Sequence, residues 1–168
     1  MNEKAFTILE VVGAIFILTV GTSSAFILIS QTFSATSLVK NKLVAVYLAQ
    51  EGIEIVRNIR ETTWLQKRTD STLSWDQYLP AADWQADYLN QELNQSYSAS
   101  PLNIDANGFY SYSPGSPTPF KRKISIEKID LDEDEKPDKI RVEVEVSWQE
   151  RGRTHNFKAL EYVTNWYE

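Results

Sequence analysis

The chain has 168 residues, no cysteine and one histidine, with 17 Lys and Arg against 23 Asp and Glu and a formal net charge of −6. These counts exclude a disulfide framework, a thiolate zinc site, a cysteine nucleophile and a multi-histidine metal site. The acidic balance argues against broad nucleic-acid binding, so no nucleic-acid partner is expected.

A long uncharged segment lies near the N-terminus. Residues 11–39 carry no charge, and residues 11–29 are dense in Val, Ile, Leu and Phe. About 20 such residues suffice to cross a bilayer, and the run exceeds the roughly 7–15 apolar residues of a cleavable signal peptide. We therefore expect a membrane-spanning helix. Glu10, at its N-terminal edge, either lies at headgroup depth or pairs with a cation in an assembly, because a lone carboxylate in hydrocarbon is costly.

The apolar segment continues into an amphipathic stretch with no proline before Pro80. Apolar residues recur at spacings of three and four, which predicts one helix from about Phe6 to about Glu61. The stripe expected to face a domain consists of Val39, Leu43, Val46, Ala49, Ile53, Val56 and Ile59. A coiled coil is the alternative use of such a stripe, although this one covers only about three heptads.

The rest of the chain predicts β-structure. Asn107-Gly108 ahead of residues 109–112 indicates a hairpin turn followed by a strand. Strict apolar and polar alternation predicts antiparallel strands with one wet face. The segments expected to form a three-stranded meander are residues 123–127, 140–148 and 156–166. The predicted fold class is thus α+β, a long N-terminal α-helix packed against an antiparallel β-sheet head.

The residues around Glu10 carry a resemblance. Lys4 to Glu10 reads Lys-Ala-Phe-Thr-Ile-Leu-Glu, which resembles the processing site of type IV prepilins and type II secretion pseudopilins. The resemblance implies that a prepilin peptidase cuts between Ala5 and Phe6 and methylates the new amine of Phe6. It also implies that Glu10 acts in assembly, by pairing with that amine on a neighbouring subunit. Ala5 departs from the Gly that usually precedes the cut, which leaves the rate of cleavage open.

Three further stretches, residues 48–54, 108–112 and 162–166, are similar to bacterial PilV-like minor pilins. With the leader, they imply a pilin-like organisation along the whole chain. Its expected parts are a prepilin leader (1–5), a transmembrane and filament-core half of the helix (6–30), an amphipathic half (31–63), a turn-rich connecting region with short strands (64–119) and a β-meander (120–168).

The function implied is that of a structural subunit, a minor pilin, of a type IV pilus, and no enzyme activity is expected. The implied partners are other pilin subunits, the prepilin peptidase, an inner-membrane assembly platform and membrane lipid. Before assembly the chain would be a single-pass protein of the bacterial inner membrane with a cytoplasmic N-terminus, and afterwards part of an extracytoplasmic filament. A type II secretion pseudopilin and a non-polymerising membrane-anchored head are the alternatives, and the sequence does not choose among adhesion, motility, DNA uptake and secretion.

One acidic run, residues 130–138, has part of the spacing of an EF-hand loop. The carboxylates with that spacing are Asp130, Asp132, Asp134 and Asp138. Glu135 stands where the loop needs Gly, and Arg141 where it needs a bidentate Glu. A solvated hairpin tip is therefore expected, with calcium as the alternative that the resemblance to pseudopilins supports. No other cofactor is expected.

Overall fold

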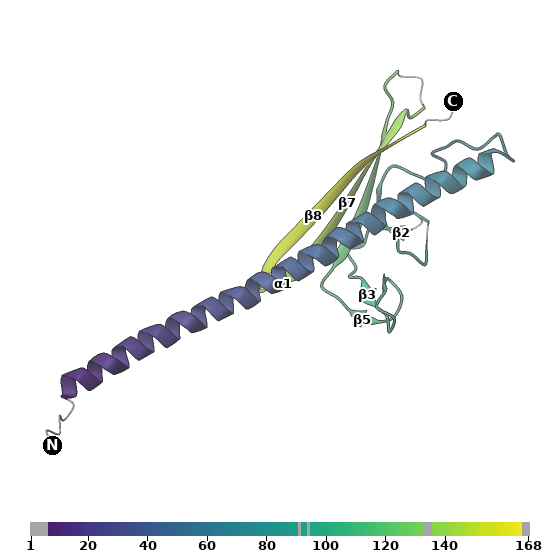
Figure 1. Cartoon of the computed structure of the whole chain (residues 1–168). Coiled ribbons are helices and arrows are strands. Elements are labelled where there is room, and N and C mark those ends of the chain that lie inside the picture. The colour runs from purple at the N-terminus through teal and green to yellow at the C-terminus, as the bar shows by residue number, and fades with distance from the viewer. Residues whose placement is uncertain (1–6, 91, 94, 133–135, 166–168) are drawn as a thin grey trace. The chain divides into compact units, whose positions relative to one another are not determined.

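The computed structural model describes residues 7–90, 92–93, 95–132 and 136–165. It divides into two compact units, unit 1 (Met1–Asn41) and unit 2 (Lys42–Glu168). Helix α1 (Ile8–Lys67) contributes its first part to unit 1 and its last part to unit 2. Within unit 2 the helix packs against an antiparallel β-sheet, which confirms the predicted α+β class (Figure 1).

The described part of unit 2 contains two antiparallel sheets. The larger has the strand order β2-β1-β6-β7-β8, and the smaller has the order β4-β3-β5. The strands are β1 (Asp83–Gln85), β2 (Gln95–Ser96), β3 (Asn103–Ile104), β4 (Tyr110–Ser111), β5 (Ser116–Pro117), β6 (Lys121–Ile129), β7 (Lys139–Glu150) and β8 (Arg153–Thr164). The last three pair in sequence as a meander, as the alternating pattern predicted.

A two-residue turn joins β7 to β8. Arg151 and Gly152 have positive φ angles of 51° and 76°, the combination that a type I′ hairpin turn requires. Because the turn is this tight, Glu150 pairs directly with Arg153. The third strand of the meander therefore begins three residues before the predicted start at residue 156.

The core of unit 2 lies between α1 and the inner face of the larger sheet. The period-two alternation on β7 sends Ile140, Val142, Val144 and Val146 inward, and all four are fully buried. The buried face of α1 begins at Ala45 and reaches Thr63. The helix runs past the predicted end near Glu61, because Thr63 is buried and its hydroxyl donates to the Ile59 carbonyl at 2.8 Å.

The predicted helical stripe is correct only in its later part. Ala49, Ile53, Val56 and Ile59 are buried, whereas Val39 and Leu43 are 67% and 54% exposed. At 3.6 residues per turn, Leu43 lies about 200° around the helix from Ala45, where the buried face begins. A spacing of three and four identifies a face but does not show where that face starts, so Val39 and Leu43 were wrongly assigned to the packed side.

The helix approaches the sheet most closely at Gly52. A Cβ atom at this position would lie 2.8 Å from Val144 Cγ1 and 3.3 Å from Arg122 Cδ. Arg122 is fully buried beside it, and its guanidinium donates to the Leu48 carbonyl on α1 at 3.0 Å and to the Ala86 carbonyl. A buried guanidinium needs acceptors, and although Arg122 Nε has no partner among the described residues, the bonds of its terminal nitrogens to two carbonyls tie the helix to the sheet.

A second buried charge joins the two sheets. The carboxylate of Asp87 accepts hydrogen bonds from the backbone N–H groups of Leu89, Asn90 and Tyr112, at 3.1, 2.9 and 2.7 Å. Asp87 follows β1 of the larger sheet, and Tyr112 follows β4 of the smaller sheet. This carboxylate therefore fixes the turn-rich region, whose strands are only two or three residues long, to the meander.

An ion pair connects the segment after α1 to the C-terminal end of strand β6. Lys128 Nζ of β6 lies 2.5 Å from Asp76 Oδ2, and the Ser74 hydroxyl donates to the other oxygen. Burial by itself would raise the pKa of Asp76, but the hydrogen bonds from Lys128 and Ser74 and the charge of Lys128 more than offset it. The pKa of Asp76 is therefore held below its ordinary value of 3.8.

The first prediction concerns the close approach at Gly52. Gly52→Ala should destabilise unit 2 by about 1–3 kcal/mol, because the new methyl group overlaps the branched side chain of Val144. The measurement is unfolding of the full chain in detergent, followed by circular dichroism. The control is Gly13→Ala, since a Cβ at Gly13 meets nothing within 4 Å. In a Val144→Ala background, Gly52→Ala should cost less stability. A Gly52→Ala chain that is as stable as wild type would contradict the packing described.

The second prediction concerns the loss of folding stability at acidic pH through Asp76. Because the folded pKa of Asp76 is depressed, its contribution to stability is present above pH 3.8 and is lost as the pH falls through the lower, folded pKa. Lys128→Met removes the charge that lowers the pKa, so acid unfolding should begin at a higher pH than in wild type. Acid titrations of the two chains, followed by tryptophan fluorescence, measure this shift. Identical acid midpoints would show that the pair contributes nothing.

Candidate membrane and assembly segment

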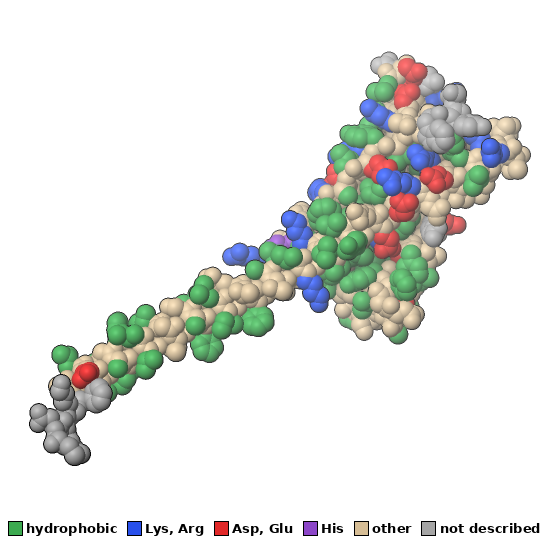
Figure 2. Space-filling model, viewed as in Figure 1, with side chains coloured by type: hydrophobic (Ala, Val, Ile, Leu, Met, Phe, Trp, Pro, Cys, Tyr) green, Lys and Arg blue, Asp and Glu red, His purple; other side chains and the backbone are tan. Residues whose placement is uncertain are grey.

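The first part of α1 presents its apolar side chains on all sides. Every residue from 7 to 33 is exposed, including Phe16, Ile17 and Phe26 at 67–72%. Figure 2 shows these hydrophobic side chains along the N-terminal stretch of the helix. Among the described residues, α1 is the one helix long and apolar enough to cross a membrane. A helix that is hydrophobic all round needs lipid or other apolar helices around it.

Several hydroxyl side chains in this part of α1 donate hydrogen bonds to the helix backbone itself. The hydroxyls of Thr19, Thr22 and Ser24 donate to carbonyls three or four residues earlier, at 2.8–2.9 Å. Thr32 and Thr36 do the same at 2.9 Å. Because these hydroxyls need no water, they do not exclude the helix from hydrocarbon.

Glu10 lies in the first turn of α1 and takes part in its N-terminal cap. Its backbone N–H donates to the Thr7 carbonyl at 3.0 Å and to Thr7 Oγ1 at 3.3 Å. The spacing Thr7-x-x-Glu10 is that of a capping box, and a carboxylate in the first turn also interacts favourably with the helix dipole. The sequence contains this capping signal, which the role of Glu10 as a membrane-edge carboxylate does not indicate. The predicted processing residues, Ala5 and Phe6, lie outside the described residues.

The acidic turn between β6 and β7 gathers three of its four predicted carboxylates. One oxygen from each of Asp130, Asp132 and Asp138 lies within 4.8 Å of the others. Asp138 Oδ2 also accepts the backbone N–H of Leu131 at 2.6 Å. The fourth predicted ligand, Asp134, lies outside the described residues. The cluster could supply oxygen ligands to a divalent cation, and calcium at this turn stays a prediction.

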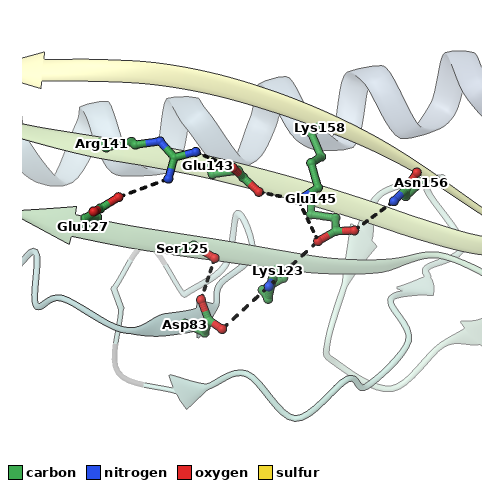
Figure 3. Close-up of polar contacts among 9 residues, drawn as sticks. All are labelled: Asp83, Lys123, Ser125, Glu127, Arg141, Glu143, Glu145, Asn156 and Lys158. Atoms are coloured by element: carbon green, nitrogen blue, oxygen red, sulfur yellow. Dashed lines mark hydrogen bonds and ion pairs between the residues drawn. The ribbon is translucent and has the colours of Figure 1, made fainter.

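The outer face of the larger sheet carries alternating charges. As Figure 3 shows, Arg141 bridges Glu127 and Glu143 at 3.1 and 2.8 Å, and Lys158 contacts Glu143 at 2.6 Å. The hydrogen bond from Lys158 is the main cause of a lowered pKa at Glu143. Lys123 lies within 4 Å of carboxylates on both sides. These pairs contribute little stability each, and they balance the charges of Lys123, Arg141 and Lys158 on this face.

Comparisons with known proteins do not assign the chain to a family. No protein-family model, curated protein or solved structure matches the chain. The class that fold and segment define is an α+β chain whose N-terminal helix is long and apolar enough to cross a membrane. Any finer function must be argued from the chain's own residues.

Proposed function

We propose that the chain is a structural subunit, a minor pilin, of a type IV pilus, held in the bacterial inner membrane by α1 until it joins the filament. The observation that carries this proposal is the run Lys4 to Glu10 directly before an apolar helix. A plain anchor has no use for a cleavable leader followed by a carboxylate at the membrane edge. The processing sites would be Ala5 and Phe6, with the prepilin peptidase and the assembly platform as partners.

The surface of α1 supports the same proposal. Residues 7–33 expose apolar side chains on every side, and this surface is larger than a single soluble partner would cover. Lipid can surround this segment before assembly, and the helices of other subunits can surround it afterwards. The arrangement of unit 2, a helix against an antiparallel sheet, is consistent with a pilin-like head.

Glu10 would set the register of assembly. In a filament core with little water, an unpaired carboxylate costs several kcal/mol, whereas one paired with the amine of Phe6 on a neighbouring subunit does not. Subunits that dock out of register would leave both charges unmatched. The electrostatic term therefore acts mainly on specificity, while the apolar surface supplies the attraction.

Two alternatives use the same residues. A type II secretion pseudopilin would be processed and assembled in the same way, and the carboxylate cluster at the acidic turn is the observation that favours it. A membrane-anchored head that never polymerises would use Glu10 only locally, as a carboxylate in the first turn of α1 that interacts favourably with the helix dipole.

The third prediction separates capping from charge pairing at Glu10. Glu10→Gln keeps a side chain that suits the last position of a capping box, while Glu10→Ala removes both that side chain and the charge and leaves the bond from the backbone N–H to Thr7 in place. If the charge pairs between subunits, both variants should stay in the membrane and both should lose filament incorporation by roughly tenfold or more. Carbonate extraction of membranes and sheared filament fractions from the host measure the two quantities.

The same pair of variants can contradict the proposal. If Glu10→Gln assembles like wild type while Glu10→Ala does not, the side chain acts through the cap and pairing between subunits is refuted. Loss of both variants from the membrane pellet would mean that Glu10 is needed for insertion.

A further inference from the structure

The two hairpin turns of the meander carry opposite charge. The turn between β6 and β7, residues 130–138, has six Asp and Glu against one Lys, whereas the β7–β8 turn has Arg151 and, at the start of β8, Arg153. They lie at opposite ends of β7, a strand of 12 residues, and are therefore about 36 Å apart at 3.3 Å per residue. Unit 2 thus has an acidic end and a basic end.

Contacts with α1 show which part of the helix lies beside the basic turn. Gly52 lies against Val144, which pairs with Ala159, and Arg57 Nε bonds Glu161 Oε1 at 2.8 Å. Residue numbers therefore rise in the same direction along α1 and β8. Arg153 lies eight residues before Glu161, about 26 Å along a strand, and Lys42 lies fifteen before Arg57, about 22 Å along a helix. The basic turn is therefore level with Lys42, where the helix enters unit 2.

Cations predominate at this end of unit 2. Lys42, Lys121, Arg151 and Arg153 are all exposed, and Lys121 pairs with Ser147 near the end of β7. The facing carboxylate on the same hairpin is Glu150, which pairs with Arg153 across the turn. Lys40 comes two residues before Lys42 in the chain. Four exposed cations against one carboxylate contrast with the formal net charge of −6 for the whole chain.

The chain tethers this basic end to the predicted span. Lys42 follows Ile29 by thirteen residues, about 20 Å along a helix. The headgroup layer takes up roughly 6 Å of that length. The distance that remains between the headgroups and Lys42 is comparable with a Debye length of about 8–10 Å. Tilting of the spanning helix would shorten this distance. The acidic end lies at the other end of β7 within unit 2.

We propose that the basic end of unit 2, defined by Lys42, Lys121, Arg151 and Arg153, docks on anionic lipid headgroups and so orients the head on the membrane before assembly. The inference rests on the proposed membrane anchor. Each cation near an anionic surface raises the docked population roughly fivefold. The acidic turn is repelled by the same surface, so the two ends favour one orientation, with the acidic turn pointing away from the lipid.

The absence of cysteine makes a direct test possible. Thr154→Cys puts a single, exposed label site beside the basic turn, and Leu131→Cys puts one at the acidic turn. The full chain is reconstituted into vesicles of phosphatidylcholine, with or without phosphatidylglycerol, and outward-facing heads are labelled with an impermeant fluorophore. Quenching by a headgroup-attached quencher reports contact with the lipid surface. Retention of the chain after a carbonate wash reports the anchor separately.

The proposal expects quenching at residue 154 that is stronger with phosphatidylglycerol and weakens in high salt, with little quenching at residue 131. The double variant Arg151→Gln, Arg153→Gln should lower the docked population roughly twenty-five-fold. Both positions are exposed and glutamine keeps an unbranched polar side chain at each, so folding is not expected to change. The matched control, Arg68→Gln with Lys136→Gln, removes the same charge outside the basic end and should leave the quenching unchanged.

Two results would overturn the proposal. The first is a chain that stays in the vesicles after the carbonate wash but shows no effect on quenching at residue 154, either of phosphatidylglycerol or of the Arg151 and Arg153 substitutions compared with the control pair. Either finding refutes docking and leaves the anchor intact. A chain that the carbonate wash removes from both kinds of vesicle refutes the anchor, and docking with it.

Discussion

The close packing of α1 on the sheet at Gly52 and Arg122 is the constraint on which the rest of unit 2 depends. Gly52 lets the helix backbone approach Val144, and Arg122 uses the space beside it to reach carbonyls on α1 and after β1. A buried guanidinium with protein acceptors tolerates little displacement, because lost acceptors cannot be replaced by water. Together with the bond between Arg57 and Glu161, this contact fixes the direction of β8 along α1 and the place of each hairpin turn.

One helix thereby serves two environments. From Ala45 onward it buries one face against a sheet, whereas residues 7–33 are exposed all round and apolar. The sequence change between them is gradual, with Ser and Thr whose hydroxyls bond the helix backbone. A helix built in this way can pass from lipid to protein without a break, as a subunit that leaves a membrane for a filament requires.

The sequence predicted the elements whose pattern is local. Alternation located β6 and β7 and their inward faces, and the apolar run located the first half of α1. Partners distant in the sequence were not predictable: nothing near Arg122 indicates that its acceptors are Leu48 and Ala86, which lie 74 and 36 residues away. The start of the buried helical face was misplaced for the same reason, since the extent of the sheet sets it. The capping pair Thr7 and Glu10 was readable from the sequence, but Glu10 was interpreted only as a membrane-edge carboxylate and as an assembly residue.

The measurement that tests the account most directly is the intact mass and N-terminal sequence of the chain recovered from its native membrane, with and without the host's prepilin peptidase. The account predicts a chain that begins at methylated Phe6 when the peptidase is present and at Met1 when it is absent. A chain that begins at Met1 in both cases would contradict the filament-subunit proposal and favour a plain membrane anchor.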